Sequence, residues 1–324
     1  MDPLELIKRP VIDELSLLRS EFESSLQHSN PLLDSGLKFV SSRTGKMMRP
    51  ILTLLVAKLF GDIKKSTICA GCCFEFFHTA SLLHDDVVDE SDERRGQSSV
   101  NRAYTNKIAV LVGDYILSLA LSYATKSGYS RLIDILSSTA QNLADGELLQ
   151  LDNSFHSSYS EDTYFHIIKN KTASLFAACA EAGSFTAGAT AEHVNRLKLF
   201  GELVGISFQI RDDIFDYFDD ETIGKPTGND MREGKLTLPV IYALKHHDDA
   251  EMHNIANAVL NGDANDSDIN RLIGFAKEFN GIQYAEDLMD QYVIKAKSLL
   301  DVYPDSEVKR ALISYVDYVA SRTI

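Results

Sequence analysis

Apolar residues recur at spacings of three and four along most of the chain, as in the run Leu52, Leu55, Val56 and Leu59. This period is typical of amphipathic or buried helices, and the alternation typical of strands is rare here. The pattern predicts an all-α fold whose helices cover about residues 5–28, 46–60, 66–91, 101–124, 130–151, 161–188, 192–219, 235–247, 249–261, 267–278, 282–302 and 305–321.

The predicted helices at 66–91 and 192–219 are apolar on more than one face. Such helices are surrounded by other helices or covered by a second subunit. No stretch rich in Pro, Gly and Ser divides the chain. We therefore expect one domain over residues 1–324, built as a bundle of about ten or more helices.

The charge balance excludes several classes of partner. The 324 residues include 32 Lys and Arg against 47 Asp and Glu, a formal net charge of −15. A protein that binds nucleic acid or anionic lipid through charge needs a basic face, so we expect neither partner. No secretion signal is apparent, and the charge-poor stretches are shorter than the roughly 20 residues of a spanning helix. We expect a cytoplasmic protein without a transmembrane segment.

Three of the four cysteines form a tight group at Cys69, Cys72 and Cys73. The CxxC spacing is compatible with a zinc or redox site, but no second pair follows and the neighbouring residues are apolar. Buried, unreactive thiols are the favoured interpretation.

Two acidic clusters carry the main chemical signal. One comprises Asp85, Asp86 and Asp89, and the other comprises Asp212, Asp213 and Asp216. Both lie near the C-terminal end of a predicted apolar helix. The first and last aspartates of each cluster are four residues apart, so their carboxylates share one helical face and repel each other. The negative end of the helix dipole adds to the cost.

Bound cations would remove this repulsion. Oxygen ligands indicate a hard divalent ion, and Mg²⁺ usually takes one or two carboxylates together with water and phosphate oxygens. A single DDxxD is commonly a solvated helix end. The matched pair favours a diphosphate held between several Mg²⁺ ions.

Cations are concentrated in the loops and helix ends near these clusters. Taken singly, each is an ordinary surface cation; as a set they fit oxyanion binding, for which Arg and Lys are suited. The set is Lys46, Arg49, Arg94, Arg95, Lys171, Lys225 and Lys235.

With these motifs in place, the sequence resembles the trans-type isoprenyl diphosphate synthases. The matching motifs are GKMMRP at 45–50, FFHTASLLHDDVVDE at 76–90, RRG at 94–96, GD at 113–114, KTA at 171–173, FQIRDDIFDYFDD at 208–220 and GKPTGNDMREGKLTLP at 224–239. The resemblance implies an all-α fold around a central cavity and a homodimer. It also implies head-to-tail addition of isopentenyl diphosphate to an allylic diphosphate such as farnesyl diphosphate.

The resemblance also implies residue roles. About three Mg²⁺ ions would be held by Asp85, Asp89, Asp212 and Asp216, with Asp86 and Asp213 in support. The allylic diphosphate would be held by Arg94, Lys171, Thr172, Gln209, Lys225 and Lys235, and isopentenyl diphosphate by Lys46, Arg49, His78 and Arg95. Lys171 and the aspartates Asp85, Asp86, Asp89, Asp212 and Asp213 would form the catalytic set. Without the resemblance, His78 would be interpreted as a core histidine.

Product length is expected to depend on the turn before Asp85. In the family that the sequence resembles, bulky aromatic side chains in this turn stop growth early and small ones, as at Ala80 and Ser81, let the growing chain continue. Phe77 lies one turn deeper. This pattern favours a long product, octaprenyl diphosphate above heptaprenyl to decaprenyl, with contact to a membrane during product release. The alternatives are tight helix packing at Ala80 and Ser81, and a short-chain farnesyl or geranylgeranyl diphosphate synthase.

Other classes of protein remain open at this point. An all-α phosphohydrolase could use His84 and Asp85, but it would leave the second cluster without a role. A terpene cyclase shares the chemistry but does not need a second diphosphate site. A non-catalytic subunit of a heteromeric synthase would not need intact acidic clusters.

Overall fold

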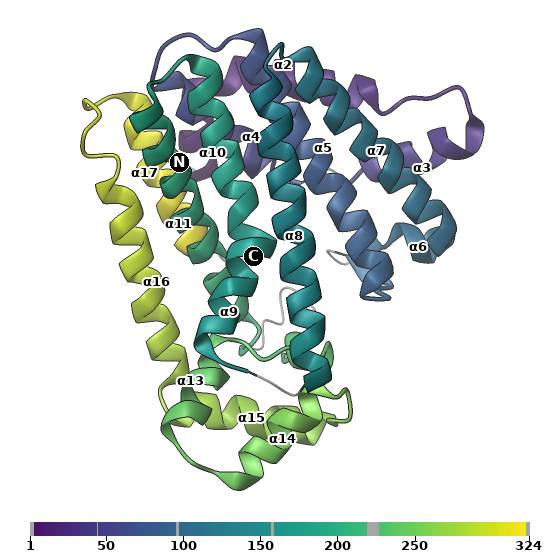
Figure 1. Cartoon of the computed structure of the whole chain (residues 1–324), viewed down its shortest axis with the longest axis vertical. Coiled ribbons are helices and arrows are strands. Elements are labelled where there is room, and N and C mark those ends of the chain that lie inside the picture. Colours follow the sequence, from purple (N-terminus) through teal and green to yellow (C-terminus); the bar gives the residue numbers. More distant parts are fainter. Residues whose placement is uncertain (1–2, 44, 95–96, 157–158, 219–226, 322–324) are drawn as a thin grey trace. The chain divides into compact units, whose positions relative to one another are not determined.

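The computed structural model describes residues 3–43, 45–94, 97–156, 159–218 and 227–321. This part of the chain is almost entirely helical (Figure 1). The strands within it form one antiparallel hairpin, β1 (Glu93–Arg94) with β2 (Gln97–Ser98), in which Glu93 pairs with Ser98. The predicted all-α fold is confirmed.

The chain divides into two compact units. Unit 1 comprises Met1–Ser138, Leu175–Gly201 and Leu300–Tyr315, and unit 2 comprises Thr139–Ser174, Glu202–Leu299 and Val316–Ile324. The organisation of residues 1–324 as a single domain stays a prediction.

Unit 1 holds most of the N-terminal helices. Its elements are α1 (Pro3–Lys8), the 3₁₀ helix η1 (Arg9–Val11), α2 (Ile12–Ser25), α3 (Pro31–Ser41), α4 (Met48–Lys58), α5 (Lys65–Val88), α6 (Val100–Ala103), α7 (Asn106–Lys126) and nearly all of α10 (Ser174–Ala187). Three further helices have residues in both units: α8 (Ser130–His156), α11 (Ala191–Phe215) and α17 (Glu307–Ser321).

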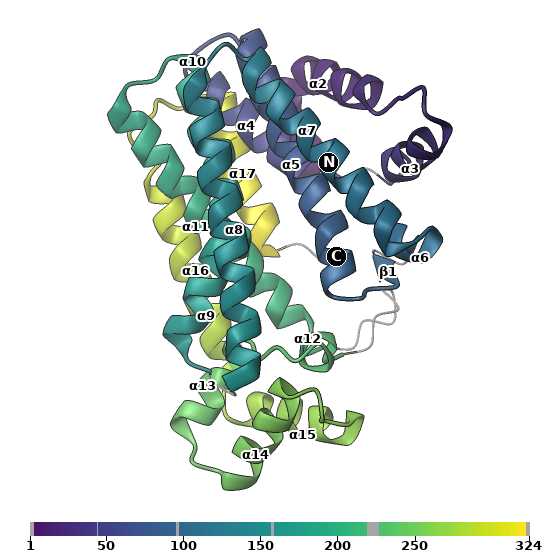
Figure 2. The same cartoon turned by 45° about the vertical axis from the view of Figure 1, so that its right-hand side comes forward.

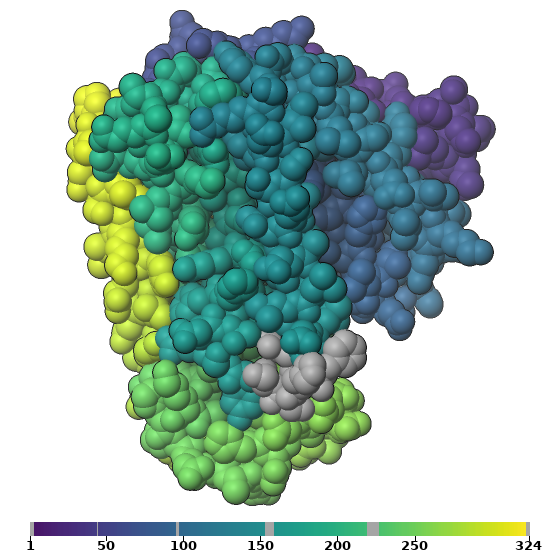
Figure 3. Space-filling view, viewed as in Figure 1, coloured from purple at the N-terminus to yellow at the C-terminus, as the bar shows by residue number. Residues whose placement is uncertain are grey.

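Unit 2 holds the remaining elements. They are α9 (Glu161–Ile168), the π-helix η2 (Lys169–Ala173), α12 (Asn229–Arg232), α13 (Leu238–His246), α14 (Ala250–Leu260), α15 (Asp266–Glu278) and α16 (Gly281–Ser298). Helix α13 packs against α15 and α16, and α14 packs against α15. Figure 3 shows α16 along the surface of this unit.

Helix α5 forms the centre of unit 1. It runs beside α7, as both Figures 1 and 2 show, and also packs against α2 and α4. Phe76 of α5 stacks on Phe22 of α2 with ring centroids 4.4 Å apart. Because neighbours surround α5, its first half is buried on every face, as its apolar sequence predicts.

The cysteines are part of this packing. Cys69, Cys72, Cys73 and Cys179 are free and buried, and no group of three or more His, Cys, Asp or Glu side chains suited to a metal occurs in the described parts of the chain. The favoured interpretation of buried thiols is confirmed.

The N-terminal helices differ from the predicted ones. The expected helix at 5–28 is interrupted by the 3₁₀ turn at Arg9–Val11, where Pro10 has no backbone N–H to donate. Helix α3 was not predicted at all. The side chain of Asn30 caps it by accepting from the backbone N–H groups of Leu32 and Leu33, and Pro31 occupies its first turn. Asn followed by Pro is a helix-start signal.

Helix α7 is the one described helix long and apolar enough to cross a membrane, judged by length and composition alone. Core helices of ordinary globular proteins pass the same test. This helix packs along α5, and 39% of its apolar window is buried within the protein.

Candidate active site

The first acidic cluster lies at the end of α5, as predicted. Asp85 is in the last turn, and the backbone N–H of Asp89, the C-cap residue, donates to the carbonyl of Asp85 at 2.8 Å. Asp89 is exposed and Asp85 half-buried, so this face of the cluster is open to a ligand. The two carboxylates therefore belong to one helical turn.

Asp86 points to the other side and is almost fully buried. Its Oδ1 accepts from Nε of Arg94, on β1, at 2.5 Å. Burial raises the pKa of Asp86, and the charge of Arg94 counteracts that rise. Asp86 thus anchors the hairpin that follows α5, and Arg94 is held at the site by a contact that the sequence could not predict.

A second pair of predicted residues meets in unit 1. Nη1 of Arg49, on α4, lies 2.8 Å from Nε2 of His78, on α5, and the Arg49 guanidinium stands 5.0 Å from the ring centre of Phe176. His78 is half-buried, and this contact satisfies its Nε2 atom. Its pairing with Arg49 agrees with their shared role in the predicted isopentenyl diphosphate site, which stays a prediction.

The second acidic cluster lies at the end of α11, in unit 2. Asp212 and Asp213 are in the last turn, and Asp216 follows immediately after the helix ends at Phe215. The two carboxylate oxygens of Asp216 accept from the backbone N–H groups of Asn229 and Asp230, at 2.8 and 3.0 Å. Asp216 thereby fixes the start of α12, which is a structural role.

Gly228 makes this arrangement possible. Its φ of +76° belongs to the left-handed region, and a Cβ atom here would lie 2.5 Å from Cγ2 of Ile269. Glycine is therefore required for the chain to turn toward Asp216.

A π-helical turn presents Lys171 and Thr172. Residues Lys169–Ala173 form η2 between α9 and α10, and such turns insert an extra residue that redirects the neighbouring side chains. Nζ of Lys171 lies 2.5 Å from Oε2 of Glu147 and 3.3 Å from Oε1 of Gln150, both on α8. The close approach of α8 depends on Gly146, where a Cβ atom would lie 3.1 Å from Lys171.

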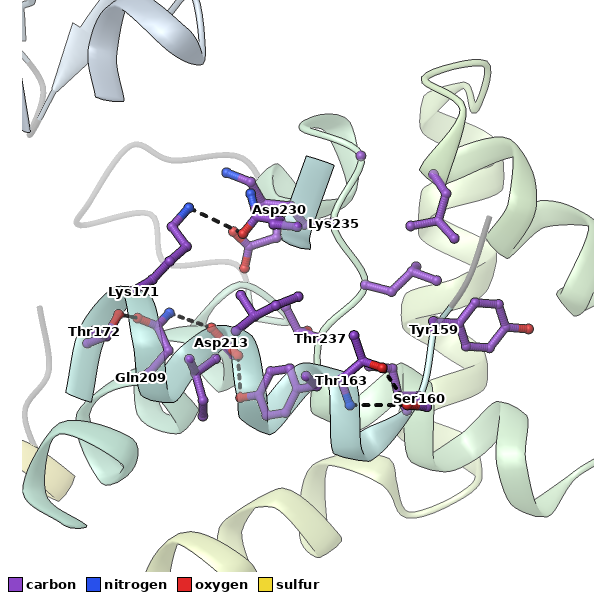
Figure 4. A pocket seen from close by; sticks show the side chains of 18 residues that line it. Tyr159, Ser160, Thr163, Lys171, Thr172, Gln209, Asp213, Asp230, Lys235 and Thr237 are labelled. Atoms are coloured by element: carbon purple, nitrogen blue, oxygen red, sulfur yellow. Dashed lines mark hydrogen bonds between the residues drawn. The ribbon is translucent and has the colours of Figure 1, made fainter. Parts of the chain in front are cut away.

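Lys171, Thr172 and Gln150 line a cavity of about 190 Å³ within unit 2 (Figure 4). Figure 4 shows Lys171, Thr172, Gln209 and Asp213 at one end and Tyr159 and Ser160 at the other. Lys235 also faces this cavity and makes an ion pair of 2.7 Å with Glu233. The structure thus brings together in one pocket four of the predicted allylic diphosphate ligands: Lys171, Thr172, Gln209 and Lys235.

Hydrogen bonds connect the pocket residues into a chain. Thr172 Oγ1 donates to Gln209 Oε1 at 2.7 Å, and Gln209 Nε2 donates to Asp213 Oδ1 at 2.8 Å. On the other carboxylate oxygen, Tyr164 Oη donates to Asp213 Oδ2 at 2.6 Å. Both oxygens of this buried carboxylate are therefore held.

Burial makes the carboxyl groups near the end of α11 and the start of α12 costly to ionise. Burial raises the pKa of Asp213 to about 7, and the neighbouring Asp212 and Asp216 add to the rise. The pKa of Asp216 and that of Asp230 are also raised, chiefly by burial, and Asp230 is further affected by Asp213 and Asp216. A set of carboxylates that resist ionisation together is suited to receive positive charge.

Magnesium fits the donors of both clusters. Its usual ligands are oxygen atoms, and it takes only one or two carboxylates when water and phosphate oxygens complete its shell. Asp85, Asp89 and Asp212 are the residues that would hold it.

Some predicted residues lie outside the described part of the chain. Arg95 and Lys225 are in this group. The pocket residues Tyr164 and Asp230 were not predicted, nor was Glu147, which pairs with Lys171. Asp230 could have been suspected from its place in the GNDMREGK motif, whereas Glu147 and Tyr164 are brought in only by tertiary contacts.

Comparisons with known proteins agree with this geometry. The sequence profile of the family described as Polyprenyl synthetase matches residues 30–275, about three quarters of the chain. The chain belongs to the polyprenyl synthetase family. The predicted family is thereby confirmed.

Individual members of the polyprenyl synthetase family match over the whole chain. Octaprenyl diphosphate synthase of Escherichia coli is 32% identical, covering 98% of this chain and 99% of that protein. The crystal structure of a decaprenyl diphosphate synthase from Rhodobacter capsulatus has a TM-score of 0.91 at 33% identity, covering 98% of both chains. That of geranylgeranyl pyrophosphate synthase from Bacteroides thetaiotaomicron has a TM-score of 0.88 at 46% identity, covering 99% and 100%.

Proposed function

We propose that this chain is a prenyltransferase that adds isopentenyl diphosphate units head to tail to an allylic diphosphate such as farnesyl diphosphate. The observation that carries the proposal is the pocket of unit 2, in which Lys171, Thr172 and Gln209 adjoin the buried carboxylate of Asp213. Cations and hydrogen-bond donors beside carboxylates form a site for a metal-bound diphosphate. Family membership supports the same conclusion.

In this proposal the protein holds and neutralises a leaving diphosphate. Lys171 and Lys235 stabilise the negative charge that develops on its oxygens as the allylic carbon–oxygen bond breaks, and the second N–H of the Gln209 amide, which Thr172 and Asp213 hold in place, donates a hydrogen bond. The double bond of isopentenyl diphosphate then attacks the allylic cation, and the resulting cation passes a proton to the departed diphosphate. Arg49 and His78 hold the diphosphate of that second substrate. No side-chain nucleophile is needed.

Magnesium is the proposed cofactor, with about three ions in the substrate complex. When bound, these ions supply positive charge that favours departure of the diphosphate. Asp85, Asp89 and Asp212 are the proposed ligands, together with Asp216 through the lone pairs that its hydrogen bonds to α12 leave available. The proposal requires that the clusters of α5 and α11 hold the same diphosphate.

A long-chain product, octaprenyl diphosphate above its neighbours, is the favoured outcome. Ala80 and Ser81 lie one turn before Asp85 on α5, and no large side chain occupies either position. Phe77 is buried one turn deeper, where it would limit the length. The names of the Escherichia coli and Rhodobacter capsulatus relatives support this length.

A short-chain product is the second candidate. The specific observation in its favour is the 46% identity to a structure named as a geranylgeranyl pyrophosphate synthase. The two candidates share every proposed catalytic residue and differ only in where the growing chain stops.

One assay tests both candidates. The purified protein alone is incubated with MgCl₂, farnesyl diphosphate and labelled isopentenyl diphosphate, and the products are dephosphorylated and separated by chain length. Products near eight isoprene units support the long-chain proposal, and termination at four units supports the short-chain one. If the wild type gives no elongation, and Asp212→Asn gives the same result, the proposed function is refuted and a non-catalytic subunit is favoured.

We propose a homodimer as the functional state. Val110, Leu111 and Leu121 are exposed on α7, and the first and last of these are eleven residues, about three turns, apart on one face. Apolar side chains grouped in this way favour a protein partner. Light scattering is expected to give twice the chain mass, and Leu111→Asp is expected to shift it toward the monomer.

The proposed setting is the cytoplasm, as one domain over residues 1–324, with membrane contact when a long product is released. Fractionation of cells that express the protein, with and without substrate, tests the setting. Recovery in an integral membrane fraction would contradict it.

A further inference from the structure

Tyr164 is the residue of the pocket whose position suggests a role that the motifs do not assign. It lies on α9, its hydroxyl donates to Asp213 Oδ2 at 2.6 Å, and its side chain is almost fully buried. A hydrogen bond to a buried carboxylate is among the stronger ones in proteins. The contact joins residues 49 positions apart in the chain.

The ring of Tyr164 is firmly supported. It belongs to an apolar cluster that includes Ile168 of α9 and Ile210 and Ile214 of α11. The two isoleucines of α11 are the immediate chain neighbours of Gln209 and Asp213. Packing therefore fixes the ring against α11, and the hydroxyl is the polar atom that this ring presents to the carboxylate.

The fixed carboxylate of Asp213 in turn constrains the side chain of Gln209. With Oδ2 held by Tyr164, Oδ1 of Asp213 is set to receive Nε2 of Gln209, one turn earlier on α11. The amide oxygen of Gln209 then accepts from Thr172. In this series of three hydrogen bonds each acceptor oxygen receives one donor. The orientation of the Gln209 amide therefore follows from that of the Asp213 carboxylate.

We infer that Tyr164 is a positioning residue: by holding Asp213 it aligns Gln209 and Thr172 for the diphosphate of the allylic substrate. Its hydroxyl proton is used by Asp213 and not by the substrate. The inference rests on the proposed function for the identity of the ligand, and it deepens that proposal by adding a determinant outside the known motifs.

Tyr164→Phe tests the inference because it removes the hydroxyl and keeps the ring. The matched control is Tyr284→Phe, which also deletes a phenol–carboxylate hydrogen bond of unit 2, to Glu161 at 2.5 Å, but away from the chain of pocket residues. Calorimetry measures binding of inorganic diphosphate in the presence of MgCl₂. We expect the Kd to rise roughly tenfold in Tyr164→Phe and less than twofold in Tyr284→Phe.

A double-variant comparison separates alignment from general loosening. If Tyr164 acts through Gln209 on Thr172, then Tyr164→Phe combined with Thr172→Val binds about as weakly as the weaker single variant. Independent effects would instead multiply. Steady-state kinetics adds a further readout: the KM for the allylic diphosphate should rise, whereas that for isopentenyl diphosphate should stay within about twofold.

Several outcomes would overturn the inference: wild-type binding by Tyr164→Phe, equal weakening in both tyrosine variants, or multiplying effects in the double variant. If Tyr164→Phe does not fold, Asp213→Asn is measured instead, because its amide cannot accept both hydrogen bonds; unchanged binding there would also overturn it. Failure of the wild type to elongate farnesyl diphosphate would refute the proposed function alone, since diphosphate binding is measured separately.

Discussion

Asp213→Asn is expected to stabilise the metal-free protein at neutral and alkaline pH. Burial raises the pKa of Asp213 from 3.8 to about 7 in the folded protein. In the unfolded chain the carboxyl group has its ordinary pKa. Folding at pH 8 therefore buries a charge that the unfolded chain carries in water.

The sign and size follow from this difference in pKa. Below about pH 3 the group is protonated in both states and contributes no penalty. As the pH rises toward 7 the unfolded state loses its proton first, so the free energy of unfolding falls, by up to roughly 4 kcal/mol at 1.36 kcal/mol per pKa unit. Asparagine carries no charge, so the free energy of unfolding of Asp213→Asn does not fall in this way. The variant does lose part of the hydrogen bonding with Tyr164 and Gln209.

The assay is thermal unfolding in EDTA between about pH 4.5 and 8.5. The Tm difference between Asp213→Asn and the wild type should grow with pH, on the order of 5–10 °C over the range. Asp290→Asn, an exposed aspartate of α16, is the matched control and should show no such trend. A Tm difference for Asp213→Asn that does not change with pH would refute the reasoning.

Further predictions concern product length, the pocket and the cysteines. Ala80→Phe should shorten the products in the elongation assay, because its ring would fill the turn before Asp85; unchanged products from it and from Ser81→Phe would remove the channel assignment. Gly146→Ala should raise the KM for the allylic substrate several-fold with little change in that for isopentenyl diphosphate, since its Cβ would press on Lys171 at 3.1 Å; equal rises for both would argue against a local effect. Burial raises the pKa of the four thiols, so a disulfide reagent should modify none of them in the native protein and all four after denaturation. Rapid native modification at Cys69 or Cys72 would revive a redox role.

The helices that carry the acidic clusters could be predicted because local patterns determine them. The apolar period runs through α5 and stops near Asp89, and the charges at the helix end identify the site before any contact is known. Helix α3 had an equally local signal in Asn30 and Pro31, and its apolar residues Leu33, Leu37 and Val40 recur at helical spacing, so its sequence was sufficient to predict it.

Other parts of the site depend on contacts that no local pattern contains. The π turn at Lys169–Ala173 continues the apolar period of its neighbours, so its sequence predicts an ordinary helix. Tyr164 resembles any buried aromatic residue until its hydroxyl meets Asp213. The resemblance implied that Asp216 is a metal ligand, and its hydrogen bonds to the start of α12 could not be foreseen.

The central claim is that the aspartates of α5 and α11 act on one diphosphate. A crystal structure with Mg²⁺ and a thio analogue of farnesyl diphosphate measures this directly. The account predicts metal ions bound by Asp85, Asp89 and Asp212 that share one diphosphate, which Lys171 also contacts. A diphosphate bound by one cluster alone, with the other left in solvent, would contradict it.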